Sequence, residues 1–271
     1  MIISFTKMQS CGNDYIYIDA RNLDLGNERK LAKSLAIRRL SVGSDGLILI
    51  KNSSVADFKM QIYNADGSEG KMCGNGIRCV GKFVYDKKLT EKKNIMIETL
   101  SGIKKVKLYL RGKEVKSASV EIGKCEPIGR LFAQNIDILG NEYKIYLVSV
   151  GNPHAVLLSN KCVNDINLEA VAKFVNKEIY HGINVEVINK LSANQLKMRV
   201  YERGSGETLA CGPGASACVG ALTMAGMLEA GKKITVCLKG GRLSVTCGAN
   251  YTLTLFGNVK TVYEGEVVLI N

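Results

Sequence analysis

Two cysteines occur in the same setting, in the stretches MCGNG at 72–76 and ACGPG at 210–214. Each cysteine directly precedes a Gly-x-Gly from which a helix can begin. A thiol at a helix N-terminus faces unpaired backbone N–H groups and the positive end of the helix dipole, and both lower its pKa. The same N–H groups can hold a carboxylate. Cys73 and Cys211 are therefore each predicted to be an acid/base thiol beside an anion site.

Two such thiols suit a two-base reaction at an amino-acid Cα. With one thiol on each side of the carbon, one thiolate removes the α-proton and the opposite thiol delivers another. This is racemase or epimerase chemistry, and it needs no cofactor, no pyridoxal phosphate and no metal ion. Only two histidines are present to serve as metal ligands. The alternative is that both cysteines are buried caps that merely start helices, but their occurrence in matched copies favours catalysis.

The cysteines belong to an internal repeat. KMQIYN at 59–64 matches KMRVYE at 197–202, at the offset that separates the two cysteines, 211 − 73 = 138 residues. Gly12-Asn13-Asp14 pairs with Gly151-Asn152-Pro153 at an offset one residue longer, and SDGLILI (44–50) falls near GINVEVI (182–188). Matched landmarks in matched order indicate two copies of one α/β unit.

The repeat predicts an α/β (α+β) fold with two pseudo-symmetric, β-rich domains, each wrapped around one long central helix. Alternating residues predict strands at 58–64 and 196–202, and helical spacing predicts helices over 77–87 and 215–230, the second stopped by Gly231. The last strand, 262–270, is expected to return to the first half. The predicted domains are 1–116 plus 262–271 and 117–261, with the active site in the cleft between them.

Composition narrows the possible classes of protein and of partner. The 271 residues are 46% apolar, which describes a globular protein, and neither an apolar run of 18 residues nor a basic-then-apolar leader occurs. A cytoplasmic protein without membrane contact is expected. The formal charge of +12 comes from scattered lysines without a nucleic-acid motif, so no nucleic-acid partner is expected. Nine cysteines without a CxxC pair fit no zinc site.

These motifs together resemble the diaminopimelate epimerase family over nearly the whole chain. The matching stretches are KMQSCGNDYIYID (7–19), YNADGSEGKMCGNGIRC (63–79), GNPHAV (151–156), GINVEV (182–187) and YERGSGETLACGPGASA (201–217). The resemblance implies two similar domains flanking a cleft and a cytoplasmic homodimer. It also implies interconversion of LL- and meso-2,6-diaminopimelate, a diamino-dicarboxylate, for lysine and peptidoglycan synthesis.

The resemblance also assigns roles to residues. Cys73 and Cys211 match the acid/base pair, assisted by His154 and Glu202 respectively; alternatively, His154 is a loop residue satisfied by backbone groups. Glu202 and Arg203 match the pair that handles the distal end of the substrate, where arginine offers a fork for a carboxylate. The other matched substrate-binding residues are Asn13, Asn64, Asn152 and Asn184, with Gly74, Asn75, Gly212 and Pro213 at the helix starts. Tyr263 matches an aromatic position at the family's dimer contact.

Two departures leave the substrate open. Pro213 replaces the usual Ser or Thr and lacks an N–H, a loss of about 1.5–3 kcal/mol if that bond to a carboxylate is not replaced. Proline is tolerated in the first helical turn, so the turn itself should persist. Gly46 stands where many members have a substrate-contacting glutamine. A related cofactor-independent racemase for lanthionine, histidine or proline is the alternative; a silent amino-acid-binding protein and a basic nucleic-acid module are lesser ones.

Overall fold

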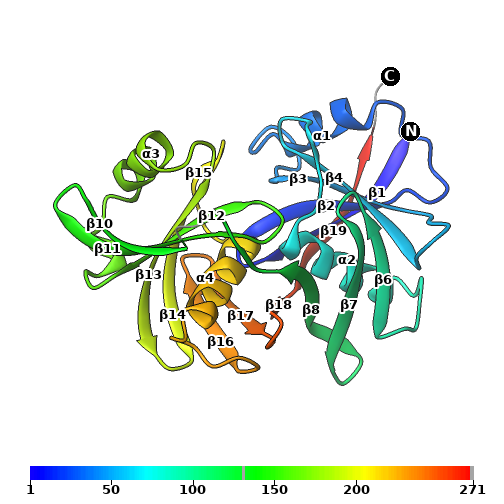
Figure 1. Cartoon of the computed structure of the whole chain (residues 1–271). Coiled ribbons are helices and arrows are strands. Elements are labelled where there is room, and N and C mark those ends of the chain that lie inside the picture. Colours follow the sequence, from blue (N-terminus) through cyan, green and yellow to red (C-terminus); the bar gives the residue numbers. More distant parts are fainter. Residues whose placement is uncertain (130–131, 269–271) are drawn as a thin grey trace. The chain divides into compact units, whose positions relative to one another are not determined.

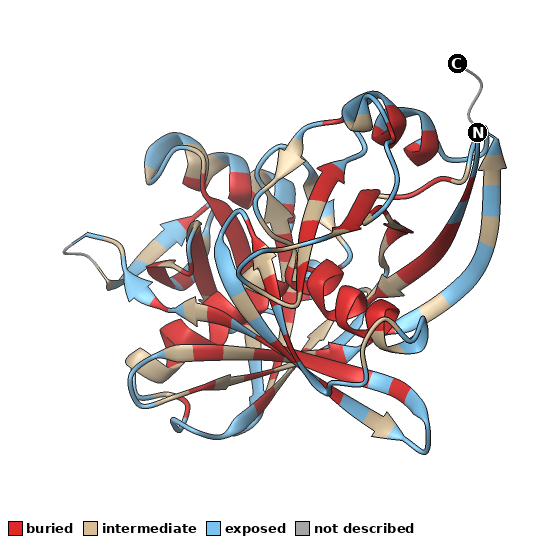
Figure 2. Cartoon of the chain, turned by 90° about the vertical axis from the view of Figure 1, so that its right-hand side faces the viewer, coloured by how far each residue is buried: buried red, intermediate tan, exposed pale blue. Residues whose placement is uncertain are grey.

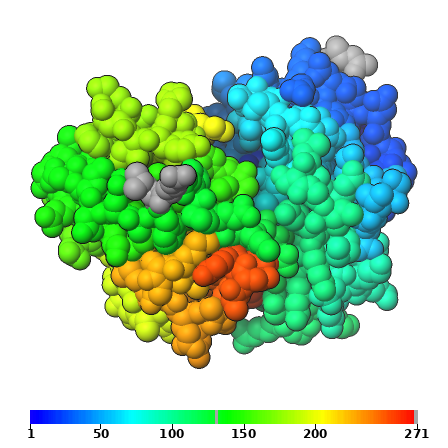
Figure 3. Space-filling view, in the orientation of Figure 1, coloured from blue at the N-terminus to red at the C-terminus, as the bar shows by residue number. Residues whose placement is uncertain are grey.

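The computed structural model describes residues 1–129 and 132–268. Contacts within the chain define two compact units. The first unit is Met1–Val120 together with the chain from Gly257 onward, and the second is Glu121–Phe256. Colours in Figure 3 run from blue to teal over most of the first unit's surface, and from green to orange over the second unit. No helix among the described residues is long and apolar enough to span a membrane.

The first unit contains β1 to β7, most of β8, α1, α2 and the last strand (Figure 1). Their bounds are β1 Ile2–Ser10, β2 Asn13–Asp19, α1 Glu28–Ala36, β3 Gly46–Lys51, β4 Phe58–Asn64, β5 Glu69–Gly70, α2 Gly74–Asp86, β6 Asn94–Thr99, β7 Gly102–Arg111, β8 Glu114–Lys124 and β19 Lys260–Val268. Strand β19 pairs antiparallel with β1, which confirms the predicted return of the last strand over its described residues.

The second unit contains the elements from β9 to β17 and most of β18. Their bounds are β9 Glu126–Pro127, β10 Ala133–Ile138, β11 Asn141–Ser149, β12 Pro153–Ser159, η1 Val163–Asp165, α3 Leu168–Glu178, β13 Asn184–Ser192, β14 Gln195–Glu202, β15 Gly206–Thr208, α4 Gly212–Met224, β16 Lys233–Leu238, β17 Gly241–Cys247 and β18 Thr252–Asn258. From β11 to β18, apart from the short helix η1, these elements repeat the order of β1 to β8, with α3 and α4 in the places of α1 and α2.

Strand register repeats as well. Strand β2 pairs in parallel with β3, placing Tyr15 beside Gly46, and β12 pairs in parallel with β13, placing His154 beside Asn184. Antiparallel pairing then joins β3 to β4 and β13 to β14. The strands predicted at 58–64 and 196–202 are therefore β4 and most of β14.

Both faces of the central strands are covered, which explains their nearly continuous apolar runs. In the first unit, Leu47 and Leu49 of β3 belong to the apolar cluster that contains Leu31 and Leu35 of α1. The intervening Ile48 points to the opposite face, where its methyl group lies against Gly76 of α2. Figure 2 shows α2 almost wholly buried, and eleven of its thirteen residues are buried.

The second unit has the same internal arrangement. Val185 and Val187 of β13 pack in one cluster with Val171 and Val175 of α3. The residue between them, Glu186, points to the other face, toward Gly214 of α4. A carboxylate therefore occupies a position where the first unit has isoleucine.

Two features of the helices differ from the sequence-based prediction. Each unit has a second helix, α1 or α3, that is capped by an asparagine. The Asn27 side chain accepts a hydrogen bond from the Lys30 N–H, and the Asn167 side chain accepts one from the Ala170 N–H. The signal was present in the sequence: the buried residues of α3 are Leu168, Val171, Ala172 and Val175, which is the spacing of an amphipathic helix. The prediction that α4 extends to Ala230 and stops at Gly231 is wrong, because α4 ends at Met224. Gly226, at φ 70°, turns the chain there instead.

Candidate active site

Cys73 and Cys211 have nearly identical backbone settings. Each is the residue that caps its helix, with φ and ψ of −127° and 118° for Cys73 and −124° and 113° for Cys211. Each Sγ accepts a hydrogen bond at 3.3 Å from the N–H three residues later, on Gly76 or Gly214. The sulfurs therefore lie where unpaired N–H groups concentrate positive potential.

Proline in the second motif leaves this turn intact, as predicted. Pro213 occupies the first turn of α4, where no intrahelical partner for its N–H would exist, and α4 starts at Gly212 as α2 starts at Gly74. Asn75 at the matched position of α2 keeps its N–H and is buried. The second helix start therefore offers one N–H fewer to a bound carboxylate.

Asn13 is held beside Cys73 by the loop before β3. A two-residue turn at Cys11 and Gly12, with φ of 54° and 81°, joins β1 to β2 and places Asn13 at the start of β2. The Asn13 amide nitrogen donates to Asp45 Oδ2 at 2.8 Å, and its Oδ1 lies 3.3 Å from Cys73 Sγ. Asp45 also accepts from the Asp14 N–H at 3.0 Å.

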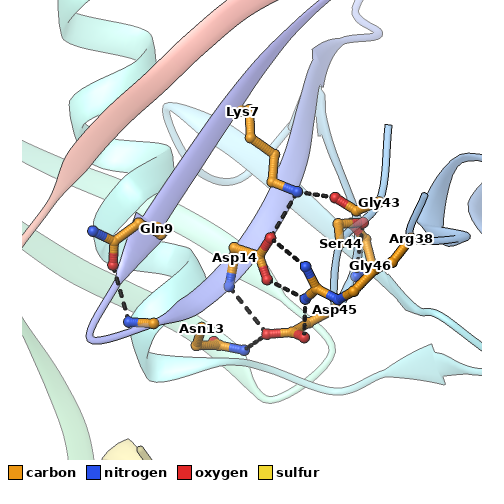
Figure 4. Close-up of polar contacts among 10 residues, drawn as sticks. Lys7, Gln9, Asn13, Asp14, Arg38, Gly43, Ser44, Asp45 and Gly46 are labelled. Carbon is orange, nitrogen blue, oxygen red and sulfur yellow. Dashed lines mark hydrogen bonds and ion pairs between the residues drawn. The ribbon is translucent and has the colours of Figure 1, made fainter. Parts of the chain in front are cut away.

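Asp45 belongs to a larger charged network, drawn in Figure 4. Arg38 Nη2 donates to Asp14 Oδ1 at 2.6 Å and to Asp45 Oδ1 at 2.9 Å. The buried Lys7 ammonium donates to the carbonyl of Gly43 and pairs with Asp14 Oδ2 at 2.7 Å. These bonds fix the β1–β2 hairpin to the loop that carries Asp45.

The electrostatic surroundings of Cys211 are acidic. Burial raises the pKa of the Cys211 thiol well above its ordinary value, and the nearby carboxylates of Glu202 and Glu186 raise it further. The Gly214 N–H acts in the opposite direction but is outweighed. The helix start therefore lowers the pKa of this thiol as predicted, but the net shift is upward, because burial and the two carboxylates outweigh the Gly214 N–H.

His154 is the middle member of a buried row of hydrogen-bonded side chains. Its Nδ1 is 2.7 Å from Glu186 Oε1 and its Nε2 is 3.1 Å from Asn152 Oδ1, and both His154 and Glu186 are fully buried. The alternative of a loop histidine satisfied by backbone groups is wrong: His154 is on β12 and bonds to side chains. Burial raises the pKa of Glu186, an effect that His154 opposes.

Three further predicted residues gather near the end of β14 in the second unit. Asn184 Oδ1 accepts from the Arg203 N–H at 2.9 Å, and Glu202 Oε1 accepts from Thr208 Oγ1 at 2.5 Å. The exposed Arg203 guanidinium makes one long contact among the described residues, 3.4 Å from Nη1 to the Gly182 carbonyl. Asn184, Glu202 and Arg203 thus bring an amide, a carboxylate and a guanidinium to the end of β14.

In the first unit, Asn64 ends β4 directly opposite Gly46. Its amide nitrogen donates to Ser68 Oγ at 2.9 Å. A Cβ on Gly46 would lie only 2.1 Å from the Tyr63 carbonyl oxygen, and φ there is 157°. This backbone admits no glutamine at position 46, so glycine is a structural requirement here.

Tyr263 lies on β19, away from the cysteine motif in sequence. Its ring meets Phe5 edge-on, with centroids 5.9 Å apart, and 44% of the residue is exposed. Within residues 1–129 and 132–268, no group of three or more His, Cys, Asp or Glu side chains is arranged to hold a metal ion.

Comparisons with known proteins identify the family. The diaminopimelate epimerase family model matches residues 5–126 and 146–270. The chain belongs to the diaminopimelate epimerase family. A diaminopimelate epimerase of Methanococcus maripaludis is 42% identical over 282 aligned positions, covering 98% of this chain and 99% of that protein. One from Acetivibrio thermocellus is 41% identical, covering 98% of each.

Solved structures share the family's fold at low sequence identity. A PhzF-family phenazine biosynthesis protein of Bacillus anthracis matches with a TM-score of 0.75 at 15% identity, covering 99% of this chain and all of that one. A hydroxyproline epimerase of Agrobacterium vitis matches with a TM-score of 0.73 at 15% identity, covering 98% and 91%. These likenesses establish a mixed α/β, β-rich architecture of the epimerase type.

Proposed function

We propose that this protein is an isomerase that interconverts LL- and meso-2,6-diaminopimelate, and that Cys73 and Cys211 are its acid/base pair. The observation that carries the proposal is the duplicated cysteine cap, identical in geometry in both units, in a chain of this family. Its product would serve lysine biosynthesis and peptidoglycan synthesis.

The proposed reaction moves two protons and requires both sulfurs to reach one Cα. One cysteine, as thiolate, takes the α-proton; the electron pair left on Cα is delocalised into the adjacent carboxylate. The second cysteine, as thiol, gives its proton to the opposite face of Cα. Charge balances, because the first sulfur becomes a thiol and the second a thiolate. The free N–H groups at the starts of α2 and α4 suit the carboxylate on which negative charge develops.

The second amino-acid end of the substrate distinguishes diaminopimelate from a simple amino acid. Arg203 has an exposed guanidinium whose planar fork suits a distal carboxylate. Asn64, Asn152 and Asn184 are assigned to the amino and carboxylate groups of the substrate, since an amide both donates and accepts. His154 is proposed to assist Cys73 and Glu202 to assist Cys211.

The finer architecture is proposed on the same basis. We place the active site where two pseudo-symmetric domains, close to residues 1–116 plus 262–271 and 117–261, both contribute residues. The functional form is proposed to be a cytoplasmic homodimer in which the exposed ring of Tyr263 makes contact with the second subunit.

The test is proton exchange at Cα in heavy water, with reductant and without pyridoxal phosphate. LL-diaminopimelate, meso-lanthionine, L-histidine and L-proline are supplied in parallel. Deuterium uptake with epimerisation of diaminopimelate alone is expected. Exchange with only another amino acid would move the protein to a sister activity, and exchange with none would refute the proposed reaction.

A further inference from the structure

Arg78 is a fully buried cation without a carboxylate partner in the described part of the chain. It lies on α2, five residues after Cys73, with none of its surface exposed. Its guanidinium donates to three neutral oxygens: the Gly74 carbonyl at 2.9 Å, Asn75 Oδ1 at 2.9 Å and Ser10 Oγ at 2.7 Å. Its Nε makes no hydrogen bond with any described residue. A buried charge with only neutral partners is costly unless an anion lies nearby.

The second unit carries no such cation at the matched position. Adding the offset of 138 to 78 gives 216, and Ser216 of α4 only donates to the Gly212 carbonyl at 3.0 Å. The reverse holds for the strand facing each helix: Ile48 lies against Gly76, whereas the matched Glu186 lies against Gly214. Buried charges of opposite sign thus accompany two cysteines with the same backbone geometry.

A full positive charge acts on Cys73. Arg78 interacts electrostatically with Cys73, and with the neighbouring thiols Cys11 and Cys79. Burial raises the pKa of Cys79 to about 12 and also raises that of Cys11, so both remain thiols at neutral pH. Of the three sulfurs, Cys73 is the one that caps a helix and accepts an N–H bond.

Three polar groups of β2 also act on Cys73. Burial raises the pKa values of Tyr15 and Tyr17 well above the ordinary range, so both hydroxyls stay neutral. The Tyr15 hydroxyl also interacts with Cys73. Asn13 Oδ1, at 3.3 Å, favours the protonated thiol and opposes Arg78. The Asp45 carboxylate, which accepts from Asn13 and acts electrostatically on Tyr15, also opposes Arg78, but it is already paired with Arg38. A full cation together with a helix N-terminus outweighs an amide dipole and a paired carboxylate.

The groups around Cys211 sum to a negative environment. Glu202, Glu186 and burial all favour the thiol, and only the Gly214 N–H opposes them. Glu186 Oε2 makes no hydrogen bond with any described residue. His154 accounts for the other oxygen, Oε1.

We propose that the buried Arg78 cation holds Cys73 as the thiolate, and that Glu186, on the matched face of the second unit, holds Cys211 as the thiol. The base and the acid of the resting enzyme are thereby fixed before substrate arrives. Arg78 and Glu186 act through the sulfurs and are positioning residues. The inference rests on the proposed two-cysteine reaction, which it extends by assigning the resting state of each sulfur.

The assignment is tested without substrate, by the pH dependence of alkylation at each cysteine. Iodoacetamide is reacted with the ligand-free protein from about pH 6 to about pH 10, and labelled peptides are quantified by mass spectrometry. Exposed Cys162 serves as an internal standard. The midpoint of each profile reports protonation whatever the accessibility of the sulfur. The midpoint for Cys73 is expected below that of Cys162, and the midpoint for Cys211 above it.

Variants then separate charge from packing. Arg78→Met should raise the Cys73 midpoint by about one pH unit or more, whereas Arg78→Lys, which keeps the charge, should leave it nearly unchanged. Glu186→Gln should lower the Cys211 midpoint without moving that of Cys73. Circular dichroism shows whether Arg78→Met folds. If it does not, the order of the two midpoints in the native protein and the shift of the Cys211 midpoint in Glu186→Gln still test the inference.

Either of two results would overturn the inference: a Cys211 midpoint below that of Cys73 in the native protein, or a Cys73 midpoint unmoved in folded Arg78→Met. Because no turnover is measured, these outcomes are independent of whether diaminopimelate is the substrate. An enzyme inactive on diaminopimelate but with the expected midpoints would refute only the proposed function.

Discussion

The carboxylate of Asp45 accepts a hydrogen bond from the Asn13 side chain at 2.8 Å, and this bond turns the amide oxygen toward Cys73. An asparagine amide can rotate to exchange its donor and acceptor, so its orientation depends on such a partner. Asp45 is itself tied to Arg38 and to the Asp14 backbone. The loop before β3 therefore controls which face of Asn13 the cysteine meets.

Asp45→Ala should lower kcat/KM roughly tenfold. The substitution removes a hydrogen bond to a carboxylate, which contributes about 1.5 kcal/mol, and so leaves the Asn13 amide free to rotate. Asp45→Asn retains an acceptor oxygen and should recover most of the rate. Steady-state kinetics on both variants check this. Arg38→Met, which removes an exposed partner of the same carboxylate, is the control and should have the smallest effect. Equal losses in Asp45→Ala and Asp45→Asn would contradict a role in orienting the amide.

Cys73→Ala and Cys211→Ala should each abolish epimerisation, with a loss of at least about a hundredfold, because each removes one of two required proton carriers. Thermal unfolding should show that both variants remain folded. Cys237, a half-buried thiol on β16, provides the matched control, and Cys237→Ala should retain activity. Full turnover in either single variant of the capping pair would eliminate the two-base mechanism.

Acid stability should depend on Glu207. The Arg199 guanidinium, which donates to this carboxylate at 2.8 and 2.9 Å, is the main cause that lowers the pKa of Glu207 to about 2 from its ordinary 4.5, with Lys239 adding to it. A lowered folded pKa stabilises the protein above the unfolded pKa, and that stability is lost as the pH falls from about 4.5 through about 2.

Glu207→Gln should therefore lower the free energy of unfolding at neutral pH by about 1 kcal/mol, because Glu207 is exposed and solvent screens most of the interaction. The difference between variant and native protein should shrink below pH 4.5. Urea unfolding at several pH values measures it. Glu142 is the control, because Glu142→Gln removes an exposed carboxylate of the same unit. A difference independent of pH would show that the charge of Glu207 is not the cause.

The repeated cysteine motif was readable from sequence because it depends on local chemistry. A cysteine followed by Gly-x-Gly can cap the helix that begins after it, and both copies keep the apolar periodicity of their strands and helices. The strands β4 and β14, the helix α2 and the start of α4 could therefore be predicted. The end of α4 could not, because AGMLEA continues the apolar pattern while Gly226 turns the chain. The apolar pattern shows where a helix is possible, whereas the backbone conformation of Gly226 determines where α4 ends.

The electrostatics of the site depend on contacts that local patterns do not reveal. Glu186 lies in the quoted stretch GINVEV, and a carboxylate in a buried apolar strand was the available signal for it. Arg78 and Asp45 each stand within a quoted motif, yet each has a partner far away in sequence: Ser10 of β1 for Arg78 and Asn13 of β2 for Asp45. The upward pKa shift of Cys211 arises first from burial and then from the carboxylates of Glu202 and Glu186, so the helix start alone could not predict the net direction.

Gly46→Gln, which installs the residue common in the family, should destabilise this protein instead of adding a substrate contact. A Cβ 2.1 Å from the Tyr63 carbonyl forces β3 away from β4, and we expect a loss of about 3 kcal/mol or more. Gly102→Gln is the control: its φ is 87° but no atom lies near the new Cβ, so only about 1–2 kcal/mol of backbone strain is expected. Chemical denaturation compares the two, and equal losses would contradict the steric argument.

Pro213→Ala restores a backbone N–H at the start of α4 and should tighten binding of the substrate carboxylate. One added bond to a charged group contributes about 1.5 kcal/mol, so KM should fall by up to about tenfold while the fold is kept. Pro213→Ser restores the same N–H and adds the hydroxyl found in many relatives. If alanine and serine lower KM equally, the N–H is responsible; a gain with serine alone assigns the effect to the hydroxyl. An unchanged KM in both variants would show that the substrate carboxylate does not bind the N–H at position 213.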